Sequence, residues 1–345
     1  MKKLLLLVMA LVGSVSAFAQ VSDIVTATLQ TDEGTTVFYG YESFASALNA
    51  APAEGSSTIT LSPGTFKNPG GISKNVKIYG AGFEDDVVNK IPKTCVEGDI
   101  YVSSTNTLSP VVHLEGIYFK THIIVNGKQS ISDLEIVKCC FECFYQRQVT
   151  NNTIIRQCYI RTSITGENYE CTQFLVANCW MLRFENFLVT STVNVDHCII
   201  AEDYYGLACA VYTNNIINSS NTYRIAAGST CKNNVSTNFR LDVGGHNNCT
   251  DNYDVTKWQS FENLFADGQN DLAYYLTDTT TPRTWVLKEP DTYKGTDGKP
   301  CGVSGGHYPW NFTPVIPRIY STTVDSESEF GKLNVTIKAE AGSAE

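Results

Sequence analysis

A pentapeptide that recurs along the middle of the chain constrains the fold more than any other feature of the sequence. It has, in most copies, an apolar residue, any residue, a polar residue, then Cys, Asn or another small residue, and a final apolar residue. The copies are ISKNV (72–76), VEGDI (96–100), HLEGI (113–117), VKCCF (137–141), IRQCY (155–159), VANCW (176–180), VDHCI (195–199), YTNNI (212–216), CKNNV (231–235) and CTDNY (249–253). Their fourth positions are 17 to 24 residues apart. Such a step is typical of a solenoid, in which each coil stacks on the next.

Short strands, rather than helices, are expected within each coil. Apolar residues alternate with others in short runs, as at Ile123 and Val125 or at Val193 and Val195, and turn residues separate these runs. Leucine-rich repeats need a Leu-x-x-Leu-x-Leu frame that is absent, and helical repeats need longer units. The pattern therefore predicts an all-β chain that forms a right-handed parallel β-helix, a solenoid of about ten coils.

The register of the pentapeptides predicts three columns of side chains along the solenoid. The first positions should stack inward: Val137, Ile155, Val176, Val195, Tyr212, Cys231 and Cys249. The fifth positions should form a second inward stack: Phe141, Tyr159, Trp180, Ile199, Ile216, Val235 and Tyr253. The fourth positions should form one straight ladder, here Cys140, Cys158, Cys179, Cys198, Asn215, Asn234 and Asn252. A small side chain suits a tight bend, where Asn can also bond the backbone.

Twelve cysteines in one chain raise the alternatives of disulfides and a metal site. Because Asn or Val aligns with them in other coils, we expect most of Cys140, Cys158, Cys179, Cys198, Cys231 and Cys249 to be buried free thiols. Stacked coils nevertheless bring Cα atoms within the range that a disulfide tolerates. The spacing of Cys139, Cys140 and Cys143 could hold zinc, but no second pair of ligands follows at the spacing of a zinc site. We therefore predict neither metal nor cofactor.

The first residues predict export. Lys2 and Lys3 precede an apolar run from 4 to 12, and the small-x-small site at 17–19 ends at Ala19. This order is typical of a secretory signal peptide, here residues 1–19, cleaved near Ala19. The apolar run is short for the alternative of a membrane anchor, which needs roughly 20 residues. No later segment is apolar enough to span a membrane, so the expected location is secreted or periplasmic.

The rest of the chain divides into three parts. Residues 20–70 should form an N-terminal cap and entry strands, with a short helix in 41–52 that has Ser43 as its N-cap, places Phe44 and Leu48 on one face, and stops at Pro52. In 57–66, a strand should turn at 63–64 and return. Residues 71–257 should form the β-helix. Residues 258–345 should form a C-terminal cap, with some helix in 258–276, a Gly/Pro-rich loop in 298–317 and a last strand in 332–339.

Two segments carry a resemblance to a known family. TITLSPGTF (58–66) with GISKNVKIYGAG (71–82), and DGKPCGVSGGHYPWN (297–311) with PVIPRIY (314–320), resemble the first coils and the closing segment of secreted pectin-lyase-like β-helix proteins of Gram-negative bacteria. The resemblance implies the right-handed parallel β-helix fold. It leaves the activity open, because this fold hosts lyases, hydrolases, esterases and adhesins.

No complete catalytic motif is present, so whether the chain is an enzyme stays open. The second pentapeptide positions present Lys138, Arg156, Asp196 and Lys232, interrupted by Ala177 and Thr213, and this is no acidic calcium cluster. A galacturonan-hydrolase motif is present only in fragments, at 245–246 and 224–225, with an Asp pair at 85–86 near the entry end, away from His246. A pair of glycosidase carboxylates could come from Asp196, Glu202, Asp203 or Asp242, and nothing in the sequence selects among them.

The net charge of −10 disfavours non-specific binding to nucleic acid, and a monomer is expected. We predict a carbohydrate-binding or scaffolding protein at the cell surface or in the periplasm, with a polysaccharide as its partner. The alternatives are a lyase or hydrolase with a divergent site, and an adhesin that binds a protein. The candidate ligand site is Arg183, Glu202, Asp203 and Tyr204, where arginine could hold a carboxylate and tyrosine a sugar ring. Arg183 and Glu202 could instead form a surface ion pair.

Overall fold

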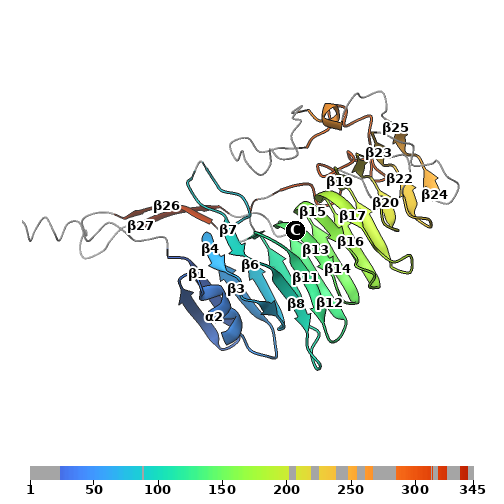
Figure 1. Cartoon of the computed structure of the whole chain (residues 1–345). Coiled ribbons are helices and arrows are strands. Elements are labelled where there is room, and N and C mark those ends of the chain that lie inside the picture. The colour runs from blue at the N-terminus through green and yellow to red at the C-terminus, as the bar shows by residue number, and fades with distance from the viewer. Residues whose placement is uncertain are drawn as a thin grey trace, which may run out of the picture.

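The chain folds as a parallel β-solenoid of about nine turns, as the repeat predicts (Figure 1). The computed structural model describes residues 24–87, 89–201, 207–218, 225–237, 248–254, 261–266, 285–311, 313, 318–324 and 335–340. Within these residues nearly all regular structure is β, and the one α-helix lies at the N-terminal end of the stack. Each coil contributes strands to two large sheets, here named sheet A and sheet B.

Sheet A begins with an antiparallel hairpin and continues as a parallel ladder. Its order is β2 (Gly34–Tyr39), β1 (Thr26–Thr31), β3 (Ser57–Leu61), β6 (Val76–Tyr79), β9 (Val112–Glu115), β12 (Ile131–Val137), β14 (Thr150–Arg156), β16 (Cys171–Ala177), β18 (Val193–Asp196), β20 (Val211–Thr213), β22 (Thr230–Lys232) and β24 (Asn248–Thr250). β1 is antiparallel to both β2 and β3, and every later pairing in the sheet is parallel.

Sheet B stacks the strands that follow those of sheet A along the chain. Its main path is β4 (Gly64–Lys67), β7 (Thr94–Glu97), β10 (Tyr118–Phe119), β13 (Cys140–Gln146), β15 (Tyr159–Thr165), β17 (Trp180–Glu185), β19 (Ile199–Ile200), β21 (Ile216–Ile217), β23 (Val235–Ser236) and β25 (Tyr253–Asp254). A branch of β5 (Gly71–Ile72), β8 (Ile100–Ser104) and β11 (Ile123–Gly127) joins the path at β13. β3 and β4 belong to different sheets, so the segment 57–66 turns a corner and does not return as predicted.

The predicted N-terminal helix is present as α2 (Ser43–Ala50). Phe44 and Leu48 are buried in the same cluster as the solenoid core, so this helix covers the end of the column. Ser43 is the first helical residue and does not cap the helix as predicted, because Glu42 occupies the N-cap position without a side-chain bond. At the other end, Lys74 Nζ donates to the carbonyl oxygens of residues 48, 49 and 51, a favourable place for a cation.

From β9 onward, the corner between sheets A and B uses one residue in the left-handed region in each coil. These residues have φ between 48° and 69°: Gly116, Lys138, Gln157, Asn178, His197, Asn214, Asn233 and Asp251. Most non-glycine residues avoid this region, but Asn and Asp tolerate it better than others. We name these residues the corner column. The residue that follows each of them points inward and belongs to the ladder.

The ladder is confirmed from Cys158 to Asn252. Backbone N–H groups of Cys158 and Cys179 each donate to the Sγ of the next coil at 3.4 Å, and the N–H of Cys198 donates to Asn215 Oδ1 at 2.7 Å. The N–H groups of Asn215 and Asn234 donate to the next amide oxygen in the same way, each at 3.0 Å. Thiol and amide therefore fill the same place in the bend. All twelve cysteines are free thiols, as expected.

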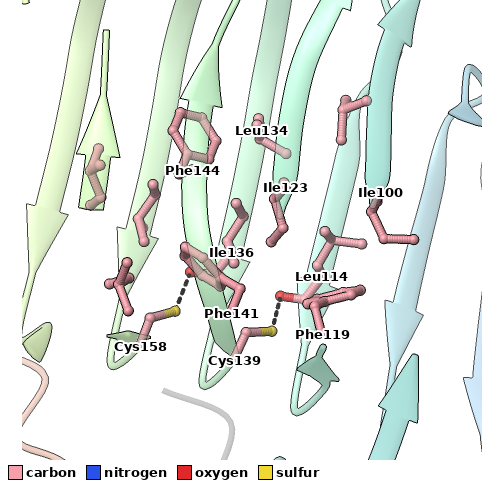
Figure 2. Packing of buried hydrophobic residues seen from close by; sticks show 14 of the residues in the cluster. Ile100, Leu114, Phe119, Ile123, Leu134, Ile136, Cys139, Phe141, Phe144 and Cys158 are labelled. Atoms are coloured by element: carbon pink, nitrogen blue, oxygen red, sulfur yellow. Dashed lines mark hydrogen bonds between the residues drawn. The ribbon is translucent and has the colours of Figure 1, made fainter. Parts of the chain in front are cut away.

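Four ladder predictions are wrong. Asn75 precedes β6 and Asp99 lies between β7 and β8, so neither is at this corner. Gly116 and Cys140 are each one residue away from the ladder, because Val137 pairs with Arg156 and Cys140 pairs with Tyr159. Cys139 is therefore the ladder residue in the coil before Cys158. The thiol of Cys139 donates to the carbonyl oxygen of Leu114, and that of Cys158 donates to the carbonyl oxygen of Ile136 (Figure 2).

The inward stack from the first positions is confirmed except at Val137, whose place is taken by Ile136. The second predicted stack is wrong for its members from Tyr159 onward. Since the ladder residue points inward, the next residue points out of the column. The residues that point inward are Phe141, Ile160, Met181, Ile200 and Ile217.

The outward row of sheet B is nonetheless buried. Tyr159, Trp180, Ile199, Ile216 and Val235 form a second apolar cluster with residues from 261 to 303. Within the described part of the predicted cap, η2 (Phe261–Leu264) is a short 3₁₀ helix. We name residues 285–311 the closing segment. Its part from 298 onward has no helix or strand, as predicted for a loop. β27 (Val335–Glu340) supports the predicted last strand and pairs with β26 (Arg318–Val324).

Candidate functional site

A groove of about 650 Å³ lies on the outer face of sheet A. It crosses β6, β9, β12 and β14, whose alternate residues Ile78, Leu114, Ile136 and Ile155 are buried in the core. Because side chains alternate along a strand, the residues between them point outward. The pairing of strands sets two rows: Lys77, His113 and Glu135 in one, and Tyr79 with Glu115 in the other.

His113 joins the two carboxylates of the groove. Its Nδ1 lies 2.8 Å from Glu135 Oε2 and its Nε2 lies 3.0 Å from Glu115 Oε2. Burial alone would lower the pKa of His113, but the bonds to Glu115 and Glu135 outweigh it and raise that pKa above its usual value. The hydrogen bond with His113, followed by the charges of His113 and Arg156, lowers the pKa of Glu135 against the opposing effect of burial. Both ring nitrogens face carboxylate oxygens, an arrangement that favours the protonated form of the ring.

Glu115 has one oxygen without a partner. Its side chain is 8% exposed, and Oε1 is buried with no hydrogen bond among the described residues. Tyr79 lies beside it, and burial together with the charges of Glu115 and Glu135 raises the pKa of Tyr79. A buried carboxylate oxygen without a donor is costly. The position is therefore suited to a donor supplied by a bound molecule.

The closing segment reaches the same face. The guanidinium of Arg156 bonds Glu135 at 3.2 Å and lies 4.7 Å from the centre of the Tyr308 ring. Just beyond the closing segment, the carbonyl oxygen of Thr313 accepts a hydrogen bond from Lys138 Nζ at 3.3 Å. The lining thus combines four cationic side chains with three carboxylates: Lys77, His113, Lys138, Arg156, Asp133, Glu115 and Glu135. This balance contrasts with the net charge of −10 of the chain.

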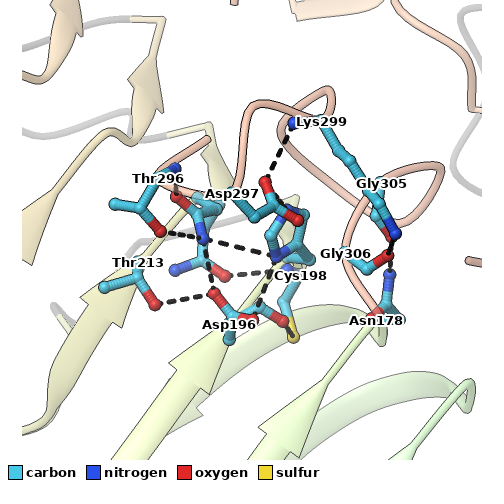
Figure 3. A network of polar contacts seen from close by, with 12 residues as sticks. Asn178, Asp196, Cys198, Thr213, Thr296, Asp297, Lys299, Gly305 and Gly306 are labelled. Atoms are coloured by element: carbon cyan, nitrogen blue, oxygen red, sulfur yellow. Dashed lines mark hydrogen bonds and ion pairs between the residues drawn. The ribbon is translucent and has the colours of Figure 1, made fainter. Parts of the chain in front are cut away.

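A second polar cluster attaches the closing segment to the corner column (Figure 3). His197 is 1% exposed and lies between Asp196, at 3.0 Å, and Asp297, at 3.6 Å. Asn214 Nδ2 donates to Asp196 Oδ1 at 2.8 Å and to Thr296 Oγ1 at 3.2 Å. Burial opposes ionisation, but the bond from His197 and its charge, with further donors, lower the pKa of Asp196. Since His197 is covered, we assign this cluster a structural role.

The corner column holds the rest of the closing segment as well. Asn178 Nδ2 donates to the carbonyl oxygens of residues 303 and 305, and Gln157 Nε2 donates to that of residue 309. Trp310 Nε1 donates to the carbonyl oxygen of Asn178 at 2.6 Å. Cys301 Sγ donates to the carbonyl oxygen of Asn233. Side chains in the left-handed region therefore point away from the core and serve as anchors.

Arg183, the one residue of the predicted site that the structure describes, does not lie in the groove. Arg183 lies in β17 of sheet B, opposite Ser163, whereas the groove lies on sheet A. Glu202, Asp203 and Tyr204 lie outside the described residues, so their part of the prediction stays a prediction. Among the second-position residues, Arg156 and Lys138 do line the groove. The residue of β12 that pairs with Arg156 in the outward row is Val137 and not Lys138.

Sequence reasoning missed the centre of the groove. Lys77, Tyr79, His113, Glu115 and Glu135 stand on three strands, and only the stacking of coils brings them together. HLEGI, the weakest copy of the pentapeptide, was the available signal. Its His and Glu stand on either side of Leu114 on one outward face.

No group of three metal-ligating side chains occurs among the residues that the structure describes. In the groove, the two nitrogens of His113 face different carboxylates, on opposite edges of the ring. Over the same described ranges, no helix has the length and apolar character needed to cross a bilayer.

The fold and the site define a parallel β-solenoid with a charged groove on the outer face of one sheet. No family model, curated protein or solved structure matches the chain. The resemblance to pectin-lyase-like proteins therefore correctly anticipates a parallel solenoid, while membership of that family stays a prediction.

Proposed function

We propose that this chain is an exported bacterial carbohydrate-binding protein, and that the groove on sheet A holds the sugar. The observation that carries the proposal is Glu115, whose Oε1 is buried in the groove wall without a donor. A sugar hydroxyl is a compact donor that can satisfy such an oxygen, since an ionised carboxylate accepts and cannot donate.

The remaining groups of the groove support the same ligand class. Its volume of about 650 Å³ is in the range of small-ligand sites. Arg156 and Lys77 can donate to ring and hydroxyl oxygens, and the Tyr79 ring offers an apolar face. The ion pairs of His113 with Glu115 and Glu135 hold the carboxylates in place before a ligand arrives. Such preorganisation lowers the entropic cost of binding.

Export is part of the proposal and rests on the signal-peptide pattern of residues 1–19. A secreted or periplasmic protein meets extracellular polysaccharides, and a polysaccharide is the partner that we propose. The groove is on an elongated sheet surface, so a longer chain could continue beyond the central sugar along the strands of neighbouring coils.

Glycan cleavage is the second candidate function. The observation that favours it is the presence of two carboxyl groups, Glu115 and Glu135, bonded to one histidine ring in the same groove. Glycoside hydrolysis uses a pair of carboxyl groups, one of which must carry a proton when it acts as acid. Release of reducing ends from a bound polysaccharide would select this candidate over simple binding.

A polysaccharide array, read for both binding and release of reducing ends, tests the proposal. For any glycan that binds, Glu115→Gln and Tyr79→Ala should each weaken binding by about tenfold or more, as expected for the loss of one ligand contact. Lys232→Ala is the matched control, because Lys232 is exposed on the same outer face but several coils away. All variants should keep the wild-type melting temperature to within a few degrees.

The proposal fails if no glycan on the array binds, or if Glu115→Gln and Tyr79→Ala bind as tightly as the wild-type protein. Equal weakening by Lys232→Ala would also count against it, because the effect would then not be specific to the groove.

A further inference from the structure

The edge of sheet A next to α2 is formed by β2, and among the described residues no strand pairs with its outer side (Figure 1). β2 has the sequence GTTVFY, with no charged residue and no proline. Natural edge strands are usually protected by lysine, proline, bulges or a covering element. Threonine, valine, phenylalanine and tyrosine are strong strand formers. This edge is therefore open to pairing with another strand.

The register of the hairpin shows which backbone groups are free. Gly40 N donates to Val25 O at 2.8 Å, and the pairing of β1 with β2 continues without a shift. In an antiparallel pair, residues alternate between bonding the partner and pointing away from it. Thr36 and Phe38 therefore bond β1, whereas Thr35, Val37 and Tyr39 direct their N–H and C=O groups outward. The side chains of Val37 and Tyr39 are 41% and 71% exposed.

We propose that β2 pairs with β2 of a second copy of this chain, antiparallel and about a two-fold axis. With Val37 opposite Val37, Thr35 lies opposite Tyr39 on both sides, and every outward backbone group of these three residues gains a partner. Such an interface is self-complementary. Because β2 carries no charge, its pairing opposes no like charges at the centre, although each chain has a net charge of −10. The expectation of a monomer from the sequence did not include this edge.

The dimer would join the two grooves on one surface. In sheet A, Val37 lies beside Thr28, Thr28 beside Thr60, Thr60 beside Tyr79, and Tyr79 beside Glu115. The free edge and the groove therefore share the outer face of the sheet. A two-fold axis through an antiparallel pair is perpendicular to the sheet, so both grooves face the same side. A polymer that reaches both would bind more tightly than one groove allows.

Sedimentation velocity over a range of protein concentrations tests the dimer without any ligand, so its outcome is independent of the proposed function. The wild-type chain should change from monomer to dimer as concentration rises. Val37→Lys should raise the dissociation constant by about tenfold or more, because it places two like charges directly opposite each other. Val37→Glu should do the same. An equimolar mixture of the two variants should form a heterodimer, since Lys then faces Glu.

Val189→Lys is the matched control, because Val189 is 71% exposed away from β2 and receives the same change of charge. It should dimerise like the wild-type chain, and all variants should keep the wild-type melting temperature. The proposal is overturned if the wild-type chain stays monomeric at its highest soluble concentration, if Val37→Lys leaves the dissociation constant unchanged, or if the mixed variants do not associate.

Discussion

Asn215 stands at the point of the ladder where thiols give way to amides, and its truncation should destabilise the chain more than that of a ladder cysteine. Its side chain is completely buried; Oδ1 accepts from the N–H of Cys198 at 2.7 Å, and Nδ2 donates to the carbonyl oxygen of Val195 at 2.8 Å. Asn215→Ala leaves the N–H of Cys198 buried without its acceptor, and it removes the amide bonds to the carbonyl oxygen of Val195 and to Asn234 Oδ1. At about 1–3 kcal/mol for the unpartnered N–H and about 1 kcal/mol for each of the two lost bonds, the expected loss is about 4 kcal/mol of unfolding free energy.

Cys179 is the matched comparison in the same corner. Its Sγ accepts from Cys158 N at 3.4 Å and donates to Ile155 O at 3.5 Å. Sulfur is a weak donor and acceptor, so these backbone groups are poorly satisfied in the wild-type chain already. Cys179→Ala should therefore cost mainly the burial of one sulfur atom, about 1–2 kcal/mol. The expected difference between the two variants is about 2 kcal/mol.

Urea unfolding followed by circular dichroism measures both variants. The slope of the free energy against urea must agree with that of the wild-type chain, because a stack of coils can lose cooperativity and the comparison then has no meaning. Asn215→Cys should lie between the two alanine variants. Equal losses for Asn215→Ala and Cys179→Ala, at unchanged slope, would refute the view that the amide satisfies the bend better than the thiol.

Three further outcomes follow from the structure. All twelve cysteines should react with a thiol reagent in denaturant without reductant. Few should react in the folded chain, because burial raises the pKa of a thiol such as Cys140 to about 12. If fewer than half react in denaturant, disulfides are present. Folding raises the pKa of His113, so its contribution to stability is complete below the unfolded pKa and is lost as pH rises through the folded pKa. Folding lowers the pKa of Glu135, so its contribution is complete above the unfolded pKa and is lost as pH falls through the folded pKa. The melting temperature, measured as a function of pH, should therefore be highest between roughly pH 5 and 6.5. His113→Gln should make the decline of the melting temperature above that range less steep. Gly305→Ala should loosen the closing segment, because a Cβ at this position would overlap the carbonyl oxygen of Pro300. Increased binding of a hydrophobic dye would report the loosening, and an unchanged dye signal would contradict it.

The general fold was predictable because the determining pattern is local and repeated. A step near one coil, alternating apolar residues and a small residue at the bend are enough to imply parallel stacking. Between Cys158 and Asn252 the ladder was predicted to the residue. The error at VKCCF arises because Cys139 and Cys140 both satisfy the pattern, and only strand pairing decides between them. A slip of one residue moves every side chain to the opposite face.

The second apolar row could not be assigned from the repeat. Tyr159 and Ile160 are both apolar and both buried, the first under the C-terminal cluster and the second in the column. A sheet covered on both faces loses the alternation of apolar and polar residues that shows direction. The outward row is covered by residues such as Trp285, whose ring centre lies 5.9 Å from that of Trp180, and no local pattern connects residues so far apart in the chain.

The same slip in register also explains why the groove was missed. With VKCCF aligned one residue too far along, Lys138 takes the outward place that belongs to Val137. HLEGI is displaced by one residue in the opposite sense, so the two errors together place Val137, and not Glu135, beside His113. In the true register, Glu135 stands beside His113 and within reach of Arg156, and HLEGI places Glu115 two residues further along the same face. Where a solenoid repeat carries polar residues at its apolar positions, the coils on either side are therefore the place to look for a site. Here those neighbours supply Tyr79, which lies beside Glu115 on β6, and Glu135, which bonds the same imidazole ring as Glu115.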